Sequence, residues 1–195
     1  MSKDWTGNKK STFATLGASN HVLHNRQEHD YYATEPRSID DLMKVEDFNG
    51  TIWEPACGEG HLSVRLEEYG KDVVSTDLID RGFGTGNFDF LNSRELLADN
   101  IITNPPYKYS EEFVRKSIEL GADKTAMFLK LTFLEGQKRF RLFSEYPPKK
   151  VWVYSSRRKC AMNGDFDSVG SSAAAYAWFI WVKGYEGDTT IGWIL

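Results

Sequence analysis

Short apolar segments alternate with amphipathic ones along this chain, and this alternation restricts the fold more than any other feature. Short strands are predicted at Thr51–Trp53, at 71–77 with its end on Asp77, and at Ile101–Thr103. Further along, the pattern predicts strands at 124–133, 148–156 and 173–184, with helices at 110–121 and 136–146. Strands that alternate with helices indicate an α/β domain with a largely parallel sheet and helices on both faces.

A single domain accounts for most of the chain. The 195 residues suffice for one sizeable core and not for two ordinary ones. Residues 1–30 are polar with little periodicity, which predicts a loop-rich arm before a domain at 31–195. Two helices should each bury one stripe: Ile39, Leu42, Met43 and Val45 after Pro36, and Leu62, Leu66 and Tyr69 after the first strand.

Composition excludes several classes of protein. The net charge of -4, from 24 Lys and Arg against 28 Asp and Glu, argues against a protein that coats nucleic acid by bulk charge. Two cysteines make no disulfide framework, and no apolar run suits a membrane helix or a secretory signal, so a cytoplasmic location is expected. The arm holds His21, His24 and His29, but nothing completes a ligand set, so no metal is expected.

The first candidate site is the stretch EPACGEG, Glu54–Gly60, between a strand and a helix. Glycines at 58 and 60 would let the backbone approach a ligand, while the spacing is neither a dinucleotide fingerprint nor a phosphate-binding loop. Glu54 suits an ammonium group, and Asp77 is placed to accept hydrogen bonds from ribose hydroxyls. A nucleoside with an amino-acid tail, S-adenosylmethionine, meets these demands. The alternative is a plain tight turn, and Cys57 is interpreted as a buried filler, not a nucleophile.

The second candidate site is Asn104-Pro105-Pro106-Tyr107, directly after an apolar strand. Prolines fix φ and lack N–H donors, so the nearby carbonyls become acceptors in a set geometry. The Asn104 side chain adds a neutral acceptor. Two such acceptors suit an exocyclic amine whose nitrogen must become pyramidal before it attacks a methyl group. Tyr107 offers a face on which a base can stack. The alternative is a simple turn after a strand.

These motifs, in the order EPACGEG, STD, FDF and NPPY, resemble the amino-group DNA methyltransferases, in particular the N6-adenine branch. The segments DYYATEP, FLKLTFLEG and AYAWFIW are similar to small adenine methyltransferases of phages and their bacterial hosts. The resemblance implies a Rossmann-like class I methyltransferase fold with a mostly parallel seven-stranded sheet. It also implies a catalytic set of Asn104, Pro105, Pro106 and Tyr107, and a cofactor-binding set of Tyr32, Thr34, Glu54, Pro55, Ala56, Cys57, Gly58, Glu59, Gly60, Asp77, Leu78, Asp89 and Phe90.

Within that set, the resemblance places Tyr32 and Thr34 beside the methionine part of the cofactor, and Asp89 and Phe90 beside its adenine. The chain departs from the family in having no room for a large target-recognition region. Its DNA specificity is therefore expected to be short, loose or supplied by a second subunit, and a homodimer is the other expected assembly. The cytosine-N4 relatives usually begin this motif with Ser, so Asn104 favours adenine.

A base in duplex DNA reaches Asn104 only if it flips out of the helix, and phosphate contacts must offset that cost. The candidate contacts are Lys108, Lys130, Arg157, Arg158 and Lys159, together with the loop 163–172; surface solvation is the alternative for each. Other functions stay open: methylation of adenine in RNA or of a protein glutamine, and a non-catalytic subunit with this fold. Tyr176, Trp178, Phe179 and Trp181 are predicted to be core.

Overall fold

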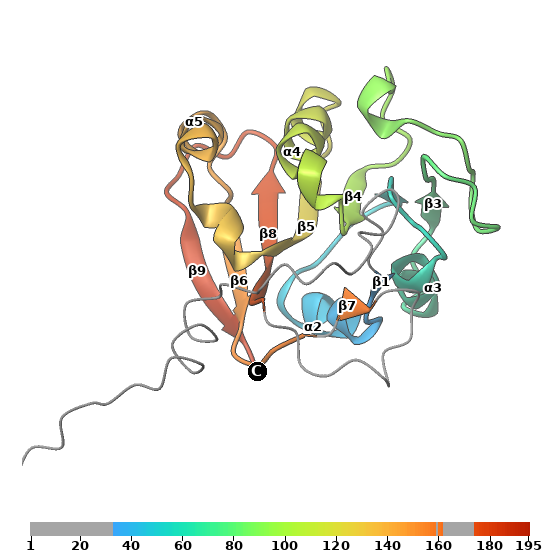
Figure 1. Ribbon diagram of the computed structural model, residues 1–195, viewed down its shortest axis with the longest axis horizontal. Coiled ribbons are helices and arrows are strands. Elements are labelled where there is room, and N and C mark those ends of the chain that lie inside the picture. Colours follow the sequence, from blue (N-terminus) through green and yellow to red (C-terminus); the bar gives the residue numbers. More distant parts are fainter. Residues whose placement is uncertain (1–32, 159, 162–173) are drawn as a thin grey trace, which may run out of the picture.

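A computed structural model describes residues 33–158, 160–161 and 174–195, and the fold in them is a mixed α/β sandwich (Figure 1). The strands are β1 Ala33–Thr34, β2 Ile52–Glu54, β3 Val73–Ser75, β4 Asn100–Thr103, β5 Lys124–Lys130, β6 Lys150–Tyr154, β7 Cys160–Ala161, β8 Tyr176–Val182 and β9 Thr190–Ile194. The helices are α2 Arg37–Val45, α3 His61–Glu68, α4 Ser110–Glu119 and α5 Gln137–Glu145, with short 3-10 turns at η2 Phe90–Asn92, η3 Tyr107–Tyr109 and η4 Leu131–Leu134.

Seven strands form the main sheet in the order β3-β2-β4-β5-β8-β6-β9. The pairs that join β3, β2, β4 and β5 are parallel, and so is the pair β6–β9. Strand β8 runs antiparallel to both of its neighbours, β5 and β6. The α/β class, the seven-stranded sheet and its mostly parallel character agree with the expectation from the sequence.

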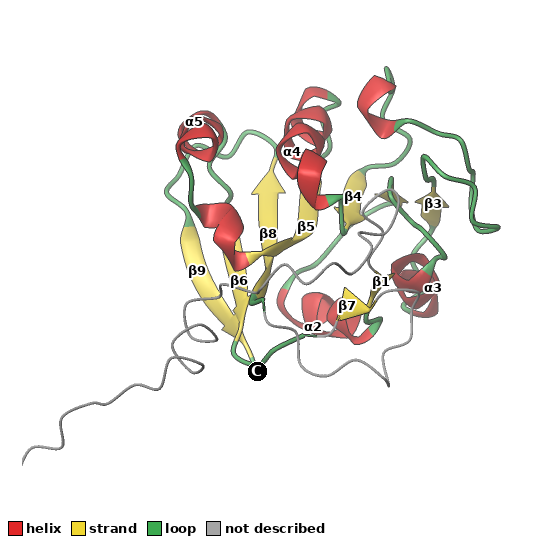
Figure 2. Cartoon of the chain, viewed as in Figure 1, coloured by secondary structure: helices red, strands yellow, loops and turns green. Residues whose placement is uncertain are grey.

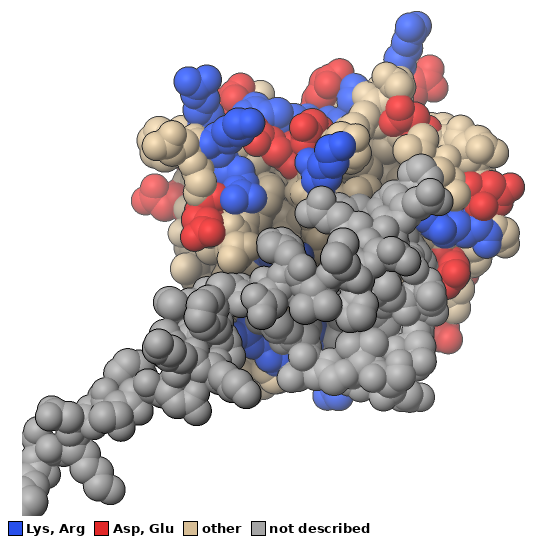
Figure 3. Space-filling view, viewed as in Figure 1, with Lys and Arg blue, Asp and Glu red and all other residues tan. Residues whose placement is uncertain are grey.

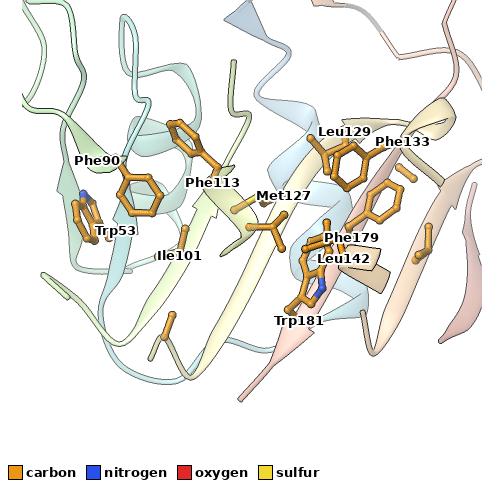
Figure 4. Packing of buried hydrophobic residues seen from close by; sticks show 14 of the residues in the cluster. Trp53, Phe90, Ile101, Phe113, Met127, Leu129, Phe133, Leu142, Phe179 and Trp181 are labelled. Carbon is orange, nitrogen blue, oxygen red and sulfur yellow. The ribbon is translucent and has the colours of Figure 1, made fainter. Parts of the chain in front are cut away.

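Helices cover both faces of this sheet, with α4 and α5 on one side and α2 and α3 on the other (Figure 2). Neighbouring positions of a strand face opposite layers, because side chains alternate along extended backbone. Ile101 packs in the α4–α5 layer, which Figure 4 shows, whereas Ile102 packs in the α2–α3 layer. In β8, Phe179 and Trp181 face the first layer and Tyr176 and Trp178 the second, and all four are buried as predicted.

Three features of the fold differ from the sequence prediction. Strand β9 forms the edge of the sheet next to β6, and the sequence analysis predicted no strand for its residues. A separate two-stranded sheet pairs β1 with β7, two segments of only two residues each. Tyr69 does not join the buried stripe of α3: the helix ends at Glu68, and Tyr69 is exposed with its hydroxyl 3.0 Å from Asp40. None of the helices in the described part of the chain is both long and apolar enough to span a bilayer.

Candidate active site

A cavity of about 930 Å³ lies where four neighbouring strands of the sheet end. Its walls include Glu54 at the end of β2, Asp77 beyond β3, Asn104 directly after β4 and Lys130 at the end of β5. Ligands of open α/β sheets bind outside the carboxyl ends of the strands, and the volume suits a small molecule together with one base. Glu54 and Asn104, one from each sequence motif, are 50 positions apart in the chain. The two motifs therefore line the same cavity.

Glu54 is a buried acid on the wall of this cavity. The residue is 2% exposed, and its carboxylate accepts a hydrogen bond from the Ser63 hydroxyl of α3. The Ser75 hydroxyl in turn donates to Ser63 at 2.7 Å. Burial raises the pKa of the Glu54 carboxyl from 4.5 to about 8, and the nearby Asp77 adds to the rise, while the Ser63 hydrogen bonds oppose it. Within residues 33–158, 160–161 and 174–195, no basic side chain forms an ion pair with Glu54, and a ligand with an ammonium group would provide such a partner.

The turn from β2 to α3 is held by Asp77. The Asp77 carboxylate accepts hydrogen bonds from the backbone N–H of Gly58 and of Ile79, each at 2.8 Å. This carboxylate therefore fixes two loops at the cavity edge, in addition to any contact it makes with a ribose.

The space beside one glycine of this turn, Gly60, is occupied by a side chain of the protein. Gly60 has a φ of +85°, and a Cβ there would lie 2.6 Å from the ring of Phe83, so the space above it is filled by that ring. Neither glycine belongs to the cavity wall, and Glu59 is exposed outside it. Pro55, Ala56 and Cys57 do line the cavity. Burial, with Glu54 and Asp77 nearby, raises the pKa of the Cys57 thiol to about 12, so it stays protonated at neutral pH.

The segment 88–91 forms another part of the wall, and Asp89 and Phe90 both belong to it. Asp89 caps η2, since its carboxylate accepts from the N–H of Leu91 at 3.0 Å and from the Asn92 side chain at 2.6 Å. The Phe90 ring is 2% exposed and packs against Trp53 and Phe113, with ring centroids 5.1 and 4.8 Å away. Phe90 is thus mainly a core residue with one edge at the cavity.

Asn104, Pro105, Pro106 and Tyr107 all line the cavity. The two prolines turn the chain from β4 into η3, where the carbonyl of Pro106 accepts from the N–H of Tyr109 at 2.9 Å. The Asn104 amide nitrogen donates to the Thr34 hydroxyl at 2.7 Å. Thr34 was expected beside the methionine part of a cofactor. It lines the same cavity, and its hydroxyl accepts this hydrogen bond from Asn104.

Tyr107 is held from two sides. Its hydroxyl lies 3.1 Å from that of Tyr176, whose ring stacks on Phe128 with centroids 4.9 Å apart. The Lys130 ammonium lies over the Tyr107 ring, 4.4 Å from its centroid. One face of the ring expected to stack on a base therefore has a cation above it. Lys108 also lines the cavity, and its ammonium lies 5.1 Å from the Tyr109 ring.

Arg158, which the sequence analysis proposed as a nucleic-acid contact, is a buried side chain in the structure. Its side chain is 7% exposed, its guanidinium pairs with the buried Asp41 of α2 at 2.8 Å, and it lies 4.5 Å over the Tyr154 ring. Arg157 is exposed, but it is not part of the cavity wall. Three other expectations, for Tyr32, Lys159 and the loop 163–172, lie outside the described residues.

The cavity wall includes residues that the sequence analysis did not select. Two of them have nitrogen-containing basic side chains: His61 at the start of α3 and Arg81 in the loop after Asp77. Others are Ala33, Leu62, Ile79, Phe88, Leu91, Tyr109 and Phe113. His61 directly follows the glycine turn, so its place at the helix start was the available signal. Among the described residues, no group of His, Cys, Asp and Glu could hold a metal ion.

Comparison with known proteins supports the fold. No protein-family model matches the chain, and no curated protein sequence does. A "putative RNA methyltransferase" from Pyrococcus horikoshii superposes with a TM-score of 0.59 and 14% identity, over 91% of this chain and 99% of that one.

Two further solved structures are similar. A dimethyladenosine transferase from Plasmodium falciparum has a TM-score of 0.56 and 16% identity, over 77% of this chain and 62% of that one. A modification subunit of a "putative type I restriction enzyme" from Vibrio vulnificus has a TM-score of 0.51 and 12% identity, over 95% of this chain and 52% of that one. The chain therefore has the Rossmann-like fold of these methyltransferases.

Proposed function

We propose that this protein transfers a methyl group from S-adenosylmethionine to the exocyclic N6 amine of adenine in DNA, after the base has flipped out of the duplex. The observation that carries the proposal is the shared cavity: Asn104–Tyr107 and the buried acid Glu54 line one space. A motif suited to an aromatic amine thus faces a site suited to an ammonium-bearing nucleoside.

The cofactor fits the residues that are present. Glu54 would hold its ammonium group, Asp77 its ribose, and Leu78, Asp89 and Phe90 would surround its adenine. When bound, S-adenosylmethionine supplies an electrophilic methyl group on sulfur. Because the pKa of Glu54 is raised to about 8, the residue is mostly protonated at pH 7 and must release that proton to pair with an ammonium.

Asn104 and the Pro105 carbonyl would hold the two N–H bonds of the adenine amine. An aromatic amine is a poor nucleophile because its lone pair is delocalised into the ring. Two acceptors that draw both hydrogens to one side favour a pyramidal nitrogen with its lone pair free to attack. Their attraction grows as positive charge develops on the nitrogen, so they stabilise the transition state more than the ground state.

Lys130 and Lys108 would contact phosphates next to the flipped base. A cation over the Tyr107 ring would oppose the positive charge that develops on the amine. Lys130 can move to a phosphate when DNA binds, which exposes the Tyr107 face for stacking and removes that repulsion. Lys130 thus belongs to DNA binding in this proposal and not to the methyl transfer itself.

Methylation of adenine in RNA is the second candidate. The structural neighbours from Pyrococcus horikoshii and Plasmodium falciparum carry names of an RNA methyltransferase and a dimethyladenosine transferase. The cavity chemistry for the target amine is the same in both cases. The motif order in the sequence favours DNA, and the substrate assay decides between the two.

The test is incubation of the full chain with radiolabelled S-adenosylmethionine and, separately, DNA, RNA and protein. Label is expected in N6-methyladenine of DNA, and Asn104→Ala should lose this transfer while it still binds the cofactor. Label in RNA or in a protein glutamine would show that the proposed substrate, DNA, is wrong. Parent-level transfer by Asn104→Ala would overturn the proposed mechanism.

Cofactor binding is tested separately by calorimetry in two buffers that differ in ionisation enthalpy. The parent should release about one proton per cofactor bound near pH 7, and Glu54→Gln should release none. Asp77→Ala is a poorer probe, because its carboxylate also holds the backbone of Gly58 and Ile79. No binding by the parent chain would indicate a non-catalytic subunit.

A further inference from the structure

Thr34 is the residue that orients the Asn104 side chain. The two residues lie 70 positions apart in the chain, yet the Asn104 amide nitrogen donates to the Thr34 hydroxyl at 2.7 Å. Thr34 is 3% exposed, so water does not compete freely for this contact. Both side chains lie on the wall of the cavity.

The Thr34 hydroxyl could accept from the nitrogen end of the carboxamide or donate to its oxygen end, and in the structure it accepts from the nitrogen. The nitrogen and oxygen ends of an Asn side chain have nearly the same shape, and a half-turn of the group exchanges them. Only the oxygen can accept a hydrogen bond from an amine. Since both ends are attached to one carbon, fixing the nitrogen on Thr34 also fixes the direction of the oxygen.

The position of Thr34 is set by backbone pairing. In the small sheet, Thr34 lies opposite Cys160 and Ala33 lies opposite Ala161, in antiparallel register. Asn104 itself follows β4 and precedes a proline, which restricts its backbone to extended conformations. Both partners of the hydrogen bond are thus held before any substrate arrives, which is what a preorganised acceptor requires.

We propose that Thr34 is a positioning residue for the methyl transfer, acting through Asn104 and not through the cofactor. This rests on the proposed function, because it presumes that the Asn104 oxygen accepts from the target amine. The resemblance to the DNA methyltransferases implies another role, contact with the methionine part of the cofactor. The two roles predict changes in different measured quantities.

The experiment compares Thr34→Val, which keeps the shape without the hydroxyl, with Thr34→Ser, which keeps the hydroxyl. Thr34→Val should lower kcat about 10- to 100-fold, the range that corresponds to one unsatisfied buried hydrogen-bonding group. The Kd for S-adenosylmethionine and the KM for DNA should change by less than about twofold. Thr34→Ser should restore most of the parent kcat.

The matched control is Thr103→Val. Thr103 is fully buried in β4 directly before Asn104, and its hydroxyl has no hydrogen-bond partner among the described residues. The same substitution there should leave kcat at the parent value. If Thr34→Val unfolds the protein, as judged by circular dichroism, Thr34→Ala and Thr34→Ser provide the same comparison.

A parent-level kcat in Thr34→Val would overturn the proposal, and so would a raised cofactor Kd with unchanged kcat, which would assign Thr34 to the cofactor. Failure of the proposed function has a different signature. In that case Asn104→Ala would itself retain parent turnover, or no adenine would be methylated by any variant.

Discussion

Glu54 lies at the end of β2 on the cavity wall, is 2% exposed, and accepts a hydrogen bond from Ser63. Its position after a strand and before a glycine turn was readable from the sequence, and so was its suitability for a cation. Its raised pKa could not be read from the sequence, because it depends on burial and on Asp77, which comes 23 positions later in the chain. Gly60 shows the same limit, since its neighbour is Phe83 and not a ligand.

Glu54→Gln should change how the stability of the folded protein depends on pH. The folded pKa of about 8 exceeds the ordinary value of 4.5, so the folded state retains a proton that the unfolded state loses. This contribution to stability is complete below pH 4.5 and is lost as the pH rises to about 8. Its slope is at most about 1.4 kcal/mol per pH unit.

Urea unfolding of both proteins at several pH values between 5 and 8 measures the effect. The free energy of unfolding of Glu54→Gln should gain on that of the parent as the pH rises. Parallel curves for the two proteins would mean that Glu54 titrates normally in the folded state. This measurement needs no cofactor, so it stands apart from the proposed activity.

Among the elements, the long strands and the helices were the most predictable. Strands β5, β6 and β8 carry continuous apolar or alternating patterns, and α4 has acidic residues in its first turn and Gly121, with a φ of +80°, after its end. Strands β1 and β7 have two residues each, too few for any periodicity, and exist only because they meet. Strand β9 has just two buried positions, Gly192 and Ile194, which is a weak signal.

The ion pair between Arg158 and Asp41 joins α2 to the segment after β6. Arg158→Ala should destabilise the protein by about 3 kcal/mol, because it leaves a buried carboxylate without this partner. The neighbouring Arg157→Ala, at an exposed position, should change stability by less than about 0.5 kcal/mol. Chemical denaturation measures both values, and equal effects would contradict the assignment of Arg158 to the core.

For the whole molecule, the sequence predicted one α/β domain with helices on both faces of the sheet. This prediction came from the alternation of strands and helices along the chain. It could not predict the charge distribution over the surface. On the face in Figure 3, basic and acidic side chains are interspersed over the α4–α5 end, consistent with the net charge of -4. The proposed DNA binding must therefore depend on a few placed cations, and not on a broad positive field.

Lys130→Met should weaken DNA binding and lower the slope of log K against log salt by about one, the value for one lost phosphate contact. The control is Lys183→Met, at a 63% exposed position beside Asp123 and outside the cavity wall, which should leave the slope unchanged. Fluorescence anisotropy with a labelled duplex over 50 to 200 mM salt measures it. An unchanged slope in Lys130→Met would remove this residue from the DNA interface.

The place of β8 between β5 and β6 has a consequence for how the protein is made on the ribosome. A nascent chain that has emerged only as far as β6 carries two hydrophobic strands, each without its central neighbour. Such unpaired edges bind other chains readily. Release of Tyr176–Val182 from the exit tunnel joins β5 to β6, so a premature stop before this segment would yield an aggregating fragment instead of a shortened folded protein.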